Sequence, residues 1–252
     1  MSEAPAPGLI PGTLYLVATP IGNLEDITLR ALRVLRQCDL VAAEDTRRTL
    51  QLLRHFQIEK PVVSCHAHNE ATRAAQLLSR LRQGATVALV TDAGSPGISD
   101  PGERIVRAVW NAGLRVEPVP GPCALVAALT ASGLPTAEFH FVGFLPHKSG
   151  ARRRRLEQLR TIPGTLVLYE SPHRIQRLLE ECAELHPDRR IVIARELTKK
   201  FEQFIRGTAR EILQQCSKRP LRGECVVLME PTEAPAGTGE SPAESRHPSD
   251  PD

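Results

Sequence analysis

Oxygen-bearing side chains stand among glycines and prolines in residues 91–102, which read TDAGSPGISDPG. Aspartate and serine can accept hydrogen bonds from an amine or a ribose hydroxyl, glycine lets the backbone approach a ligand closely, and proline fixes the path of the chain. An uncharged apolar run precedes the segment, and a helical pattern (Ile105, Val106, Val109) follows it. A mere turn between a strand and a helix would need fewer such residues. The pattern therefore predicts a ligand-binding loop at the end of a buried strand.

A second polar segment follows the apolar residues 39–43 and reads EDTRR over residues 44–48. Charges at the mouth of a buried strand cost free energy unless water, each other or a ligand satisfies them. One interpretation is a ligand-binding group. The other is the start of a helix, with Asp45 or Thr46 as its N-terminal cap and the arginines in solvent. The sequence leaves both interpretations open.

His66 and His68 have the His-x-His spacing of some metal sites, but no further clustered ligands support one. We interpret them as part of a polar loop in which Asn69 caps the next helix. The six cysteines form no CxxC pair. This argues against both a zinc site and a disulfide framework, and it indicates reduced thiols.

Four consecutive arginines occupy residues 152–155. Lys148 and Ser149, just before them, are similar to the end of a P-loop, but His147 stands where that motif requires glycine, so we reject a P-loop. Because four successive side chains cannot share one face of a helix, some of them must face solvent or a partner. Contact with phosphates is one hypothesis, and a solvated surface is the other.

Strands and helices alternate in the first half of the chain. Apolar runs predict strands at 13–18, 39–43, 61–65, 87–90 and 115–119. The first helix is expected after Asp26 or Thr28, with Leu29, Leu32 and Leu35 facing inward. The alternation predicts an α/β domain over residues 12–120 with a mostly parallel, doubly wound sheet.

Residues 120–122 read PGP and mark the predicted domain boundary. After a helix of small residues at 123–131, short strands are expected at 138–144, 165–169, 190–194, 202–206 and 223–229. Strands so closely spaced cannot each be joined by a crossover helix, so residues 121–230 are predicted to form a smaller α/β domain with a mixed sheet. Residues 231–252 are rich in Pro, Gly, Ser and Glu without periodicity, which predicts a disordered tail.

The composition is that of an ordinary soluble protein, with 252 residues of which 41% are hydrophobic and 24% charged. No apolar run approaches the roughly 20 residues of a membrane helix, and no N-terminal signal pattern is found, so we expect a cytoplasmic protein. The formal net charge is +3, but residues 231–252 carry five acids and one arginine, which leaves +7 on residues 1–230. Such a basic surface suits a polyanionic partner such as RNA, or it is simply solvated.

The polar loops after the first, second, fourth and fifth strands should gather along one edge of the first sheet, where open α/β folds bind ligands. Residues 169–174 (YESPHR) end a strand of the second domain and could close the cleft. The sequence contains no GxGxxG turn, no Walker lysine and no GxSxG elbow. The ligand is therefore expected to be held without the usual phosphate cradles.

Seven motifs, in order along the chain, resemble those of the ribosomal RNA small subunit methyltransferase I family, which belongs to the tetrapyrrole methylase superfamily. They are TPIGNL (19–24), AEDTR (43–47), DAGSPGISDPG (92–102), PGP (120–122), GFLP (143–146), YES (169–171) and AREL (194–197). The resemblance runs from about residue 12 to about residue 230. It implies two α/β domains, a homodimer, and an S-adenosylmethionine cofactor in the cleft between the domains. It further implies 2'-O-methylation of a cytidine in the decoding region of 16S ribosomal RNA, within the small ribosomal subunit.

The resemblance also implies roles for individual residues. The cofactor is expected against Pro20, Asp92, Gly94, Pro96, Ile98, Ser99, Cys123, Tyr169 and Leu197. Candidates for removing the proton of the substrate hydroxyl, or for orienting that hydroxyl, are Glu44, Asp45 and Glu170. Contacts with RNA are expected from Arg47, Lys148, Arg152, Arg153 and His173.

The chain differs from the family in one respect. Bacterial family members carry a small helical extension after the final strand, where this sequence has its polar tail. If that extension helps to dock RNA, this chain is expected to bind RNA through the remaining basic surface or with lower affinity. Two alternatives stay open. A tetrapyrrole carbon methyltransferase usually has a cofactor loop that reads GGDP, where this chain has DAGSP. A noncatalytic RNA-binding or ribosome-assembly protein with the same fold would not bind S-adenosylmethionine.

Overall fold

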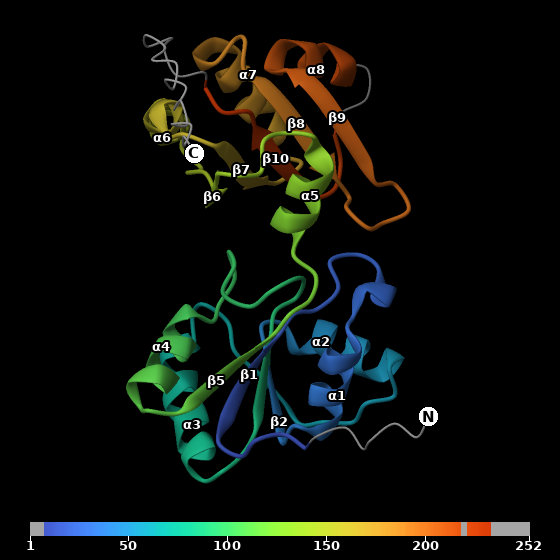
Figure 1. The fold of residues 1–252 in the computed structure, drawn as a ribbon, viewed down its shortest axis with the longest axis vertical. Helices are drawn as coiled ribbons and strands as arrows, with labels where there is room; N and C mark the ends of the chain where they lie inside the picture. Colours follow the sequence, from blue (N-terminus) through green and yellow to red (C-terminus); the bar gives the residue numbers. More distant parts are fainter. Residues whose placement is uncertain (1–7, 218–220, 233–252) are drawn as a thin grey trace, which may run out of the picture.

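The computed structural model describes residues 8–217 and 221–232, in which ten strands form two five-stranded sheets. Each sheet is the centre of one lobe, and the two lobes are stacked along the long axis of the molecule (Figure 1). The tail expected at 231–252 lies outside the described residues except for its first two positions. Within the described part of the chain, no helix is both long and apolar enough to cross a lipid bilayer.

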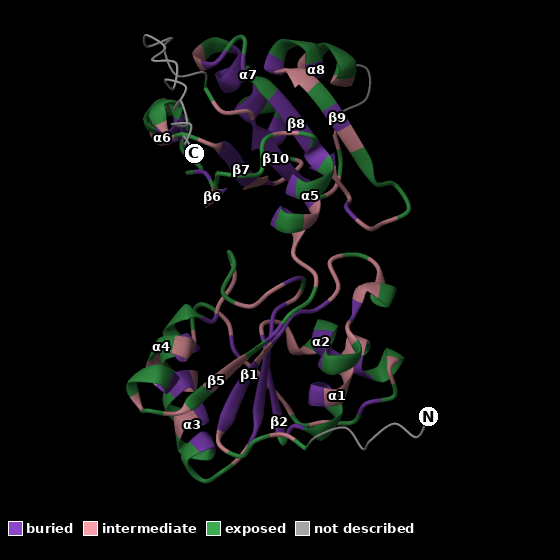
Figure 2. Cartoon of the chain, viewed as in Figure 1, coloured by how far each residue is buried: buried purple, intermediate pink, exposed green. Residues whose placement is uncertain are grey.

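The first sheet is entirely parallel, as the alternation of strands and helices predicts. Its strands are β1 (Thr13–Val17), β2 (Leu40–Ala43), β3 (Val62–Ser64), β4 (Val87–Val90) and β5 (Arg115–Val119), in the order β3-β2-β4-β1-β5. Strands β2 and β4 are buried along their whole length, and the centre of the sheet is purple in Figure 2. Because all strands run in one direction, the loops after their carboxyl ends meet at the edge that faces the second lobe (Figure 1).

Helices cover both faces of the first sheet. Helices α1 (Leu29–Gln37) and α2 (Thr46–His55) share one hydrophobic core with it, and α3 (Glu70–Arg82) and α4 (Glu103–Asn111) share the other. This arrangement is a doubly wound sheet.

The expected inward face of α1 is partly wrong. Thr28 caps the helix, since its hydroxyl accepts a hydrogen bond of 3.1 Å from the N–H of Ala31. Leu35 is buried and Leu32 packs against the core, as predicted. Leu29, however, is 87% exposed, and Ala31 and Val34 complete the buried face. The buried stripe follows the i, i+3, i+4 spacing of a helix face from Ala31, so the first helical residue, Leu29, falls outside it.

The second sheet is mixed, also as predicted. Its strands are β6 (Phe139–Phe144), β7 (Thr165–Glu170), β8 (Arg190–Arg195), β9 (Gln203–Thr208) and β10 (Cys225–Met229), in the order β6-β7-β10-β8-β9. Within this sheet, over the described residues, only β6 and β7 pair in parallel, with α6 (Ser149–Gln158) in the connection between them, and the other neighbours are antiparallel.

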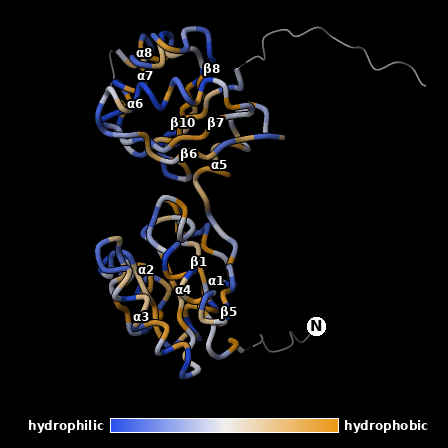
Figure 3. The backbone as a smooth tube through the Cα atoms, turned by 90° about the vertical axis from the view of Figure 1, so that its left-hand side faces the viewer, coloured by the Kyte–Doolittle hydropathy of each residue, from blue (hydrophilic) through white to orange (hydrophobic). Residues whose placement is uncertain are grey.

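The two faces of the second sheet are covered differently. Helix α5 (Ala124–Ser132) packs on the face nearer the first lobe, and α6, α7 (Ile175–Leu185) and α8 (Ala209–Cys216) pack on the opposite face. Figure 3 shows apolar chain concentrated in the interior of each lobe. We propose a domain boundary after Pro120, because α5, which begins four residues later, already packs on β7, β8 and β10.

Candidate active site

The loops after β1 and β4 are joined directly to each other. Thr19 and Gly94 exchange two backbone hydrogen bonds of 2.9 Å each. The hydroxyl of Ser95 then donates to the carbonyl oxygen of Pro122, at 3.3 Å, in the segment that leads to the second lobe. Three of the strand-end loops predicted to gather at one edge are therefore in contact.

The loop after β4 has an unusual backbone. Gly94, Gly97 and Gly102 have φ values of +86°, +83° and +147°, which favour glycine. Ser99 has φ +63°, which is uncommon for a residue with a side chain. The loop folds back on itself through a hydrogen bond of 3.2 Å from the N–H of Gly97 to the carbonyl of Pro101. The glycines of the motif are thus required by the shape of the loop.

A cavity of about 280 Å³ lies between the lobes, at this loop. Six of the nine residues expected to hold the cofactor line it: Gly94, Ile98, Ser99, Cys123, Tyr169 and Leu197. Glu170, expected to handle a proton, lines it as well. The cavity combines an apolar wall with a few polar groups, which is the usual character of a small-molecule site.

The lobes approach each other closely beside the cavity. A Cβ atom on Gly22 would lie 2.9 Å from the carbonyl oxygen of Leu197, and one on Gly143 would lie 3.2 Å from Oγ of Ser99. The second lobe contributes Tyr169, whose phenol oxygen accepts a hydrogen bond of 3.1 Å from the N–H of Leu125 and whose ring packs against Phe141 at 5.0 Å between centroids. These contacts fix the wall of the cavity that the second lobe provides.

A comparison of the whole chain with protein-family models identifies its family. The model described as Tetrapyrrole (Corrin/Porphyrin) Methylases matches residues 13–213. The chain belongs to the tetrapyrrole methylase family. The cavity of this tetrapyrrole methylase is built by the loops of both halves of the matched region.

Curated relatives are similar over most of their length. The protein named Ribosomal RNA small subunit methyltransferase I from Pseudomonas aeruginosa is 51% identical over 232 residues, which cover 90% of this chain and 81% of the relative. The protein of the same name from Haemophilus influenzae is 49% identical over 222 residues, covering 87% of this chain and 78% of the relative.

Solved structures share the fold at low sequence identity. Diphthine synthase has a TM-score of 0.67 at 18% identity, with 86% of this chain and 90% of that chain covered. Uroporphyrin-III C-methyltransferase from Thermus thermophilus in complex with S-adenosylhomocysteine has a TM-score of 0.61 at 22% identity, with 86% and 97% covered. These likenesses confirm the two-sheet α/β architecture predicted from the sequence.

Three residues expected to hold the cofactor do not line the cavity. Pro20 and Asp92 line a separate groove of about 360 Å³ on the first lobe, beside α2, together with Arg48, Gln51 and His55. Pro96 lines neither space. The sequence places all of these residues in one loop cluster, but a folded loop has two sides, and their separation depends on its backbone conformation.

The cavity is also lined by residues to which the sequence analysis gave no individual role. They include the small or apolar side chains of Ile21, Ala124, Phe144, Ala194 and Val226 and two acids, Asp100 and Glu224. Ala194 and Phe144 belong to the AREL and GFLP motifs, which were the available signal. Asp100 stands near the end of the loop formed by residues 91–102.

An acidic network lies beside the groove, at the ends of β2 and β4. The hydroxyl of Thr91 donates to Oε2 of Glu44 at 2.6 Å, and the N–H of Asp45 donates to Oδ1 of Asp92 at 3.0 Å. Burial raises the pKa of Asp92, although its other oxygen lies 3.3 Å from Nη1 of Arg48. The network connects the end of β2 to the end of β4.

Two of the three proton-handling candidates are engaged elsewhere. Asp45 caps α2 and pairs with Arg47 at 2.9 Å, and hydrogen bonds from Arg47 lower the pKa of Asp45 to about 2. A carboxylate with so low a pKa is a poor proton acceptor, so the structure supports the capping interpretation of Asp45. The side chain of Glu170 is fully buried, accepts a hydrogen bond of 2.8 Å from the N–H of Ser171, and lies 3.1 Å from Nη2 of Arg174.

The residues expected to bind RNA fall into two groups. Arg47, Lys148 and His173 are exposed, and Arg153 is partly exposed beside Glu184. Arg152 does not fit that role, because it is 3% exposed. Its guanidinium donates two hydrogen bonds to the carboxylate of Glu181, from Nε at 2.6 Å and from Nη2 at 2.7 Å. Of the four successive arginines, Arg152 is the buried one, which the sequence alone did not indicate.

The polar loop before α3 differs in detail from its prediction. Asn69 stands at the N-terminal cap position, but its side chain accepts from the N–H of His66 at 2.9 Å and donates to Ser64, and makes no cap hydrogen bond to the helix. Within residues 8–217 and 221–232, no group of three potential ligands that could hold a metal ion is found.

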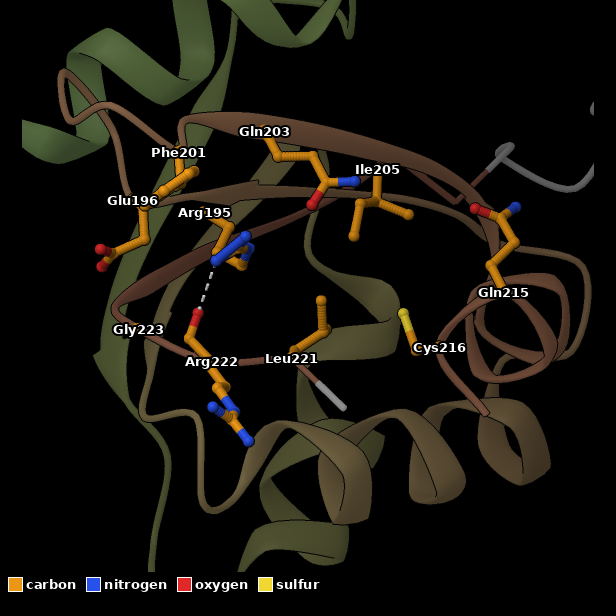
Figure 4. A pocket seen from close by; sticks show the side chains of 10 residues that line it. All are labelled: Arg195, Glu196, Phe201, Gln203, Ile205, Gln215, Cys216, Leu221, Arg222 and Gly223. Atoms are coloured by element: carbon orange, nitrogen blue, oxygen red, sulfur yellow. Dashed lines mark hydrogen bonds between the residues drawn. The ribbon is translucent and has the colours of Figure 1, made fainter. Parts of the chain in front are cut away.

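A larger space of about 790 Å³ lies on the opposite face of the second sheet (Figure 4). Arg195 lines it and donates to the carbonyl oxygen of Arg222 at 3.0 Å, the dashed line in Figure 4. Successive side chains of a strand point to opposite faces, so Ala194 lines the cavity between the lobes and Arg195 lines this space. Apart from the AREL motif, no sequence motif contributes to it, and we place the candidate active site between the lobes.

Proposed function

We propose that this chain transfers a methyl group from S-adenosylmethionine to the 2'-hydroxyl of a cytidine in the decoding region of small-subunit ribosomal RNA. The observation that carries the proposal is the cavity between the lobes, lined by the motif loops of both, in a chain about half identical to relatives named Ribosomal RNA small subunit methyltransferase I. The family match supports the methyl transfer itself.

The lining of the cavity fits this cofactor. Ile21, Ile98 and Leu197 offer apolar surface for a flat base, and Ser99 and Tyr169 offer hydroxyl groups. Gly94 presents backbone to the cavity without a side chain. When bound, S-adenosylmethionine supplies an electrophilic methyl group on a sulfonium.

The residues of the chain then have three tasks. They must hold two ligands in line, exclude competing water, and accept the proton of the ribose hydroxyl. Close contacts between the lobes at Gly22 and Gly143 narrow the access of water to the cavity. The groove beside α2 offers Arg48 and His55 to an RNA strand next to the acidic network.

The proposed RNA surface includes Arg47, Lys148, Arg153 and His173, which are at least partly exposed. Phosphate contacts would make RNA binding weaken steeply with added salt. The net charge of +7 on residues 1–230 supports the same partner.

We also propose that the protein is a homodimer and works in the cytoplasm. Exposed apolar side chains on α5 and on the edge strand β6 support an association of subunits: Val126, Phe139 and Phe144 are 52%, 43% and 56% exposed. Sedimentation of the purified protein tests the dimer directly.

The deciding experiment is methyl transfer from labelled S-adenosylmethionine to small ribosomal subunits that lack the modification, followed by nucleoside analysis. We expect label in 2'-O-methylcytidine. Binding of S-adenosylhomocysteine without label in RNA would contradict the proposed substrate and would favour a tetrapyrrole substrate. Absence of cofactor binding would favour a noncatalytic RNA-binding protein.

A further inference from the structure

Asp100 lies between the two spaces that the proposed reaction needs. Asp100 itself lines the cavity between the lobes, and Thr91, which is close enough to form a side-chain hydrogen bond with it, lines the groove beside α2. A cofactor in the cavity and an RNA strand in the groove would therefore meet at this pair. The sequence analysis gave Asp100 no role of its own, although it is one of the two acids in the loop of residues 91–102.

The hydroxyl of Thr91 faces two carboxylates but carries one proton. That proton is donated to Oε2 of Glu44 at 2.6 Å, while Asp100 also lies within hydrogen-bonding reach. With the proton directed to Glu44, the Thr91 oxygen can accept a hydrogen bond from Asp100 when Asp100 is protonated. Thr91 can thus keep its hydrogen bond to Asp100 after proton transfer, and it can turn to donate to Asp100 when that carboxylate is charged, which is the form that the Thr91 hydrogen bond favours.

The surroundings of Asp100 keep it able to take up a proton near neutral pH. Burial, with further contributions from the charges of Glu44 and Asp92, raises its pKa to about 6, against a lowering contribution from Thr91. Across the cavity it faces the phenol of Tyr169 on β7, and Glu170 lines the same cavity. Arg48 on α2 lies against Asp92, and no cation pairs with Asp100 among the described residues.

The backbone beside Asp100 has a strained conformation. Ser99, directly before it, has φ +63°, and the following Pro101 accepts the hydrogen bond from Gly97 that closes the loop. Strained residues of this kind persist where the surrounding structure fixes them, and they concentrate at active sites. The other acids nearby have partners: Asp45 pairs with Arg47, Glu170 lies against Arg174, Asp92 lies against Arg48, Glu224 pairs with Lys199, and Glu44 accepts the hydroxyl of Thr91.

We propose that Asp100 is the catalytic residue that accepts the proton of the substrate hydroxyl, and that Thr91 and Glu44 position it. The inference rests on the function proposed above. In the step, the ribose 2'-oxygen forms a bond to the methyl carbon, and the bond from that carbon to sulfur breaks with its electron pair staying on sulfur. The hydroxyl proton passes to the Asp100 carboxylate, and the products are a methyl ether, a neutral thioether and a carboxylic acid.

The test compares wild type, Asp100→Asn, Thr91→Val and the exposed control Asp188→Asn on undermethylated small subunits. We expect Asp100→Asn to lower kcat by about 10²-fold or more, with the KM for the subunits and the Kd for S-adenosylhomocysteine within about threefold of wild type. The wild-type kcat should rise with pH through an apparent pKa near 6, and Asp100→Asn should lose this limb. Asp188→Asn should match wild type throughout.

A second readout does not depend on turnover. In the protein without ligands, the carboxyl carbon of Asp100, assigned by NMR through its loss in Asp100→Asn, should titrate near 6, and higher in Thr91→Val, because a lowering hydrogen bond is removed. Titration of this carbon near pH 4, or a kcat for Asp100→Asn equal to wild type, would overturn the inference. A large loss of S-adenosylhomocysteine affinity in Asp100→Asn would overturn it too, by making Asp100 a cofactor-binding residue. A wild-type protein that does not methylate RNA refutes the proposed function instead, whatever the titration gives.

Discussion

Thr19 and Gly94 hold the loops after β1 and β4 together through two reciprocal backbone hydrogen bonds of 2.9 Å. Gly94 has φ +86°, lines the cavity, and would place a Cβ atom 3.5 Å from Cγ2 of Ile21. The space around Gly94 therefore tolerates a methyl group, and the backbone does not.

We expect Gly94→Ala to lower the free energy of unfolding by about 1–2 kcal/mol, the cost of a left-handed backbone for an L-residue, and to weaken S-adenosylhomocysteine binding. The matched control is Gly97→Ala, with φ +83°, open space around its Cβ position and no place in the cavity lining. Urea unfolding should show similar losses for both, and calorimetric titration should show weakened binding for Gly94→Ala alone. Equal binding by the two variants would contradict the assignment of Gly94.

A bulky side chain at the start of α5 should block the cavity. Ala124 is half-buried and lines it, so the indole of Ala124→Trp would occupy space that the cofactor needs. We expect the Kd for S-adenosylhomocysteine to rise at least about tenfold, or ~1.4 kcal/mol. Val126→Trp, on the same helix but 52% exposed and outside the cavity lining, should bind normally. Normal binding by Ala124→Trp would place the cofactor elsewhere.

Asp100 should make stability depend on pH. Its folded-state pKa of about 6 lies above the ordinary value of 3.8, so between these values the folded chain holds more protons than the unfolded chain. Stability contributed by the protonated form is therefore present below about pH 4 and is lost as pH rises through 6.

Asp100→Asn should remove this loss of folding stability at higher pH. Because Asp100 is only partly buried, we expect the variant to be more stable than wild type by on the order of 1 kcal/mol at pH 7.5, with a smaller difference at pH 5. Urea unfolding at both pH values measures it. A difference that does not change with pH would show that Asp100 has an ordinary pKa in the folded chain.

The buried pair of Arg152 and Glu181 should matter for folding. Nε of Arg152 lies 2.6 Å from Oε2 of Glu181, and Ser149 donates to the same carboxylate at 2.7 Å. Glu181→Gln would leave a guanidinium buried without a counter-charge, so we expect a loss of about 3–5 kcal/mol. Glu184→Gln removes the exposed partner of Arg153 and should cost less than about 1 kcal/mol. Equal effects in thermal unfolding would contradict this distinction.

The sequence by itself predicted both sheets and the loops that line the cavity between the lobes. Uncharged runs such as residues 87–90 have few alternatives to a buried strand, and glycines and prolines after them mark loops of special shape. The parallel order of the first sheet and the mixed second sheet followed from the spacing of the strands. The family resemblance added the residues that share the cavity, and six of the nine named for the cofactor lie there.

Only the tertiary structure decided which polar residues are free to act. Asp45, Glu170 and Arg152 carry the right charges in the right motifs, but Arg47, Arg174 and Glu181 occupy them. Asp100, with no special mark in the sequence, lines the cavity without a cation partner in the described chain. The reason is physical: local patterns fix the periodicity and turns of a chain, whereas the availability and pKa of a charged group depend on burial and on partners distant in sequence.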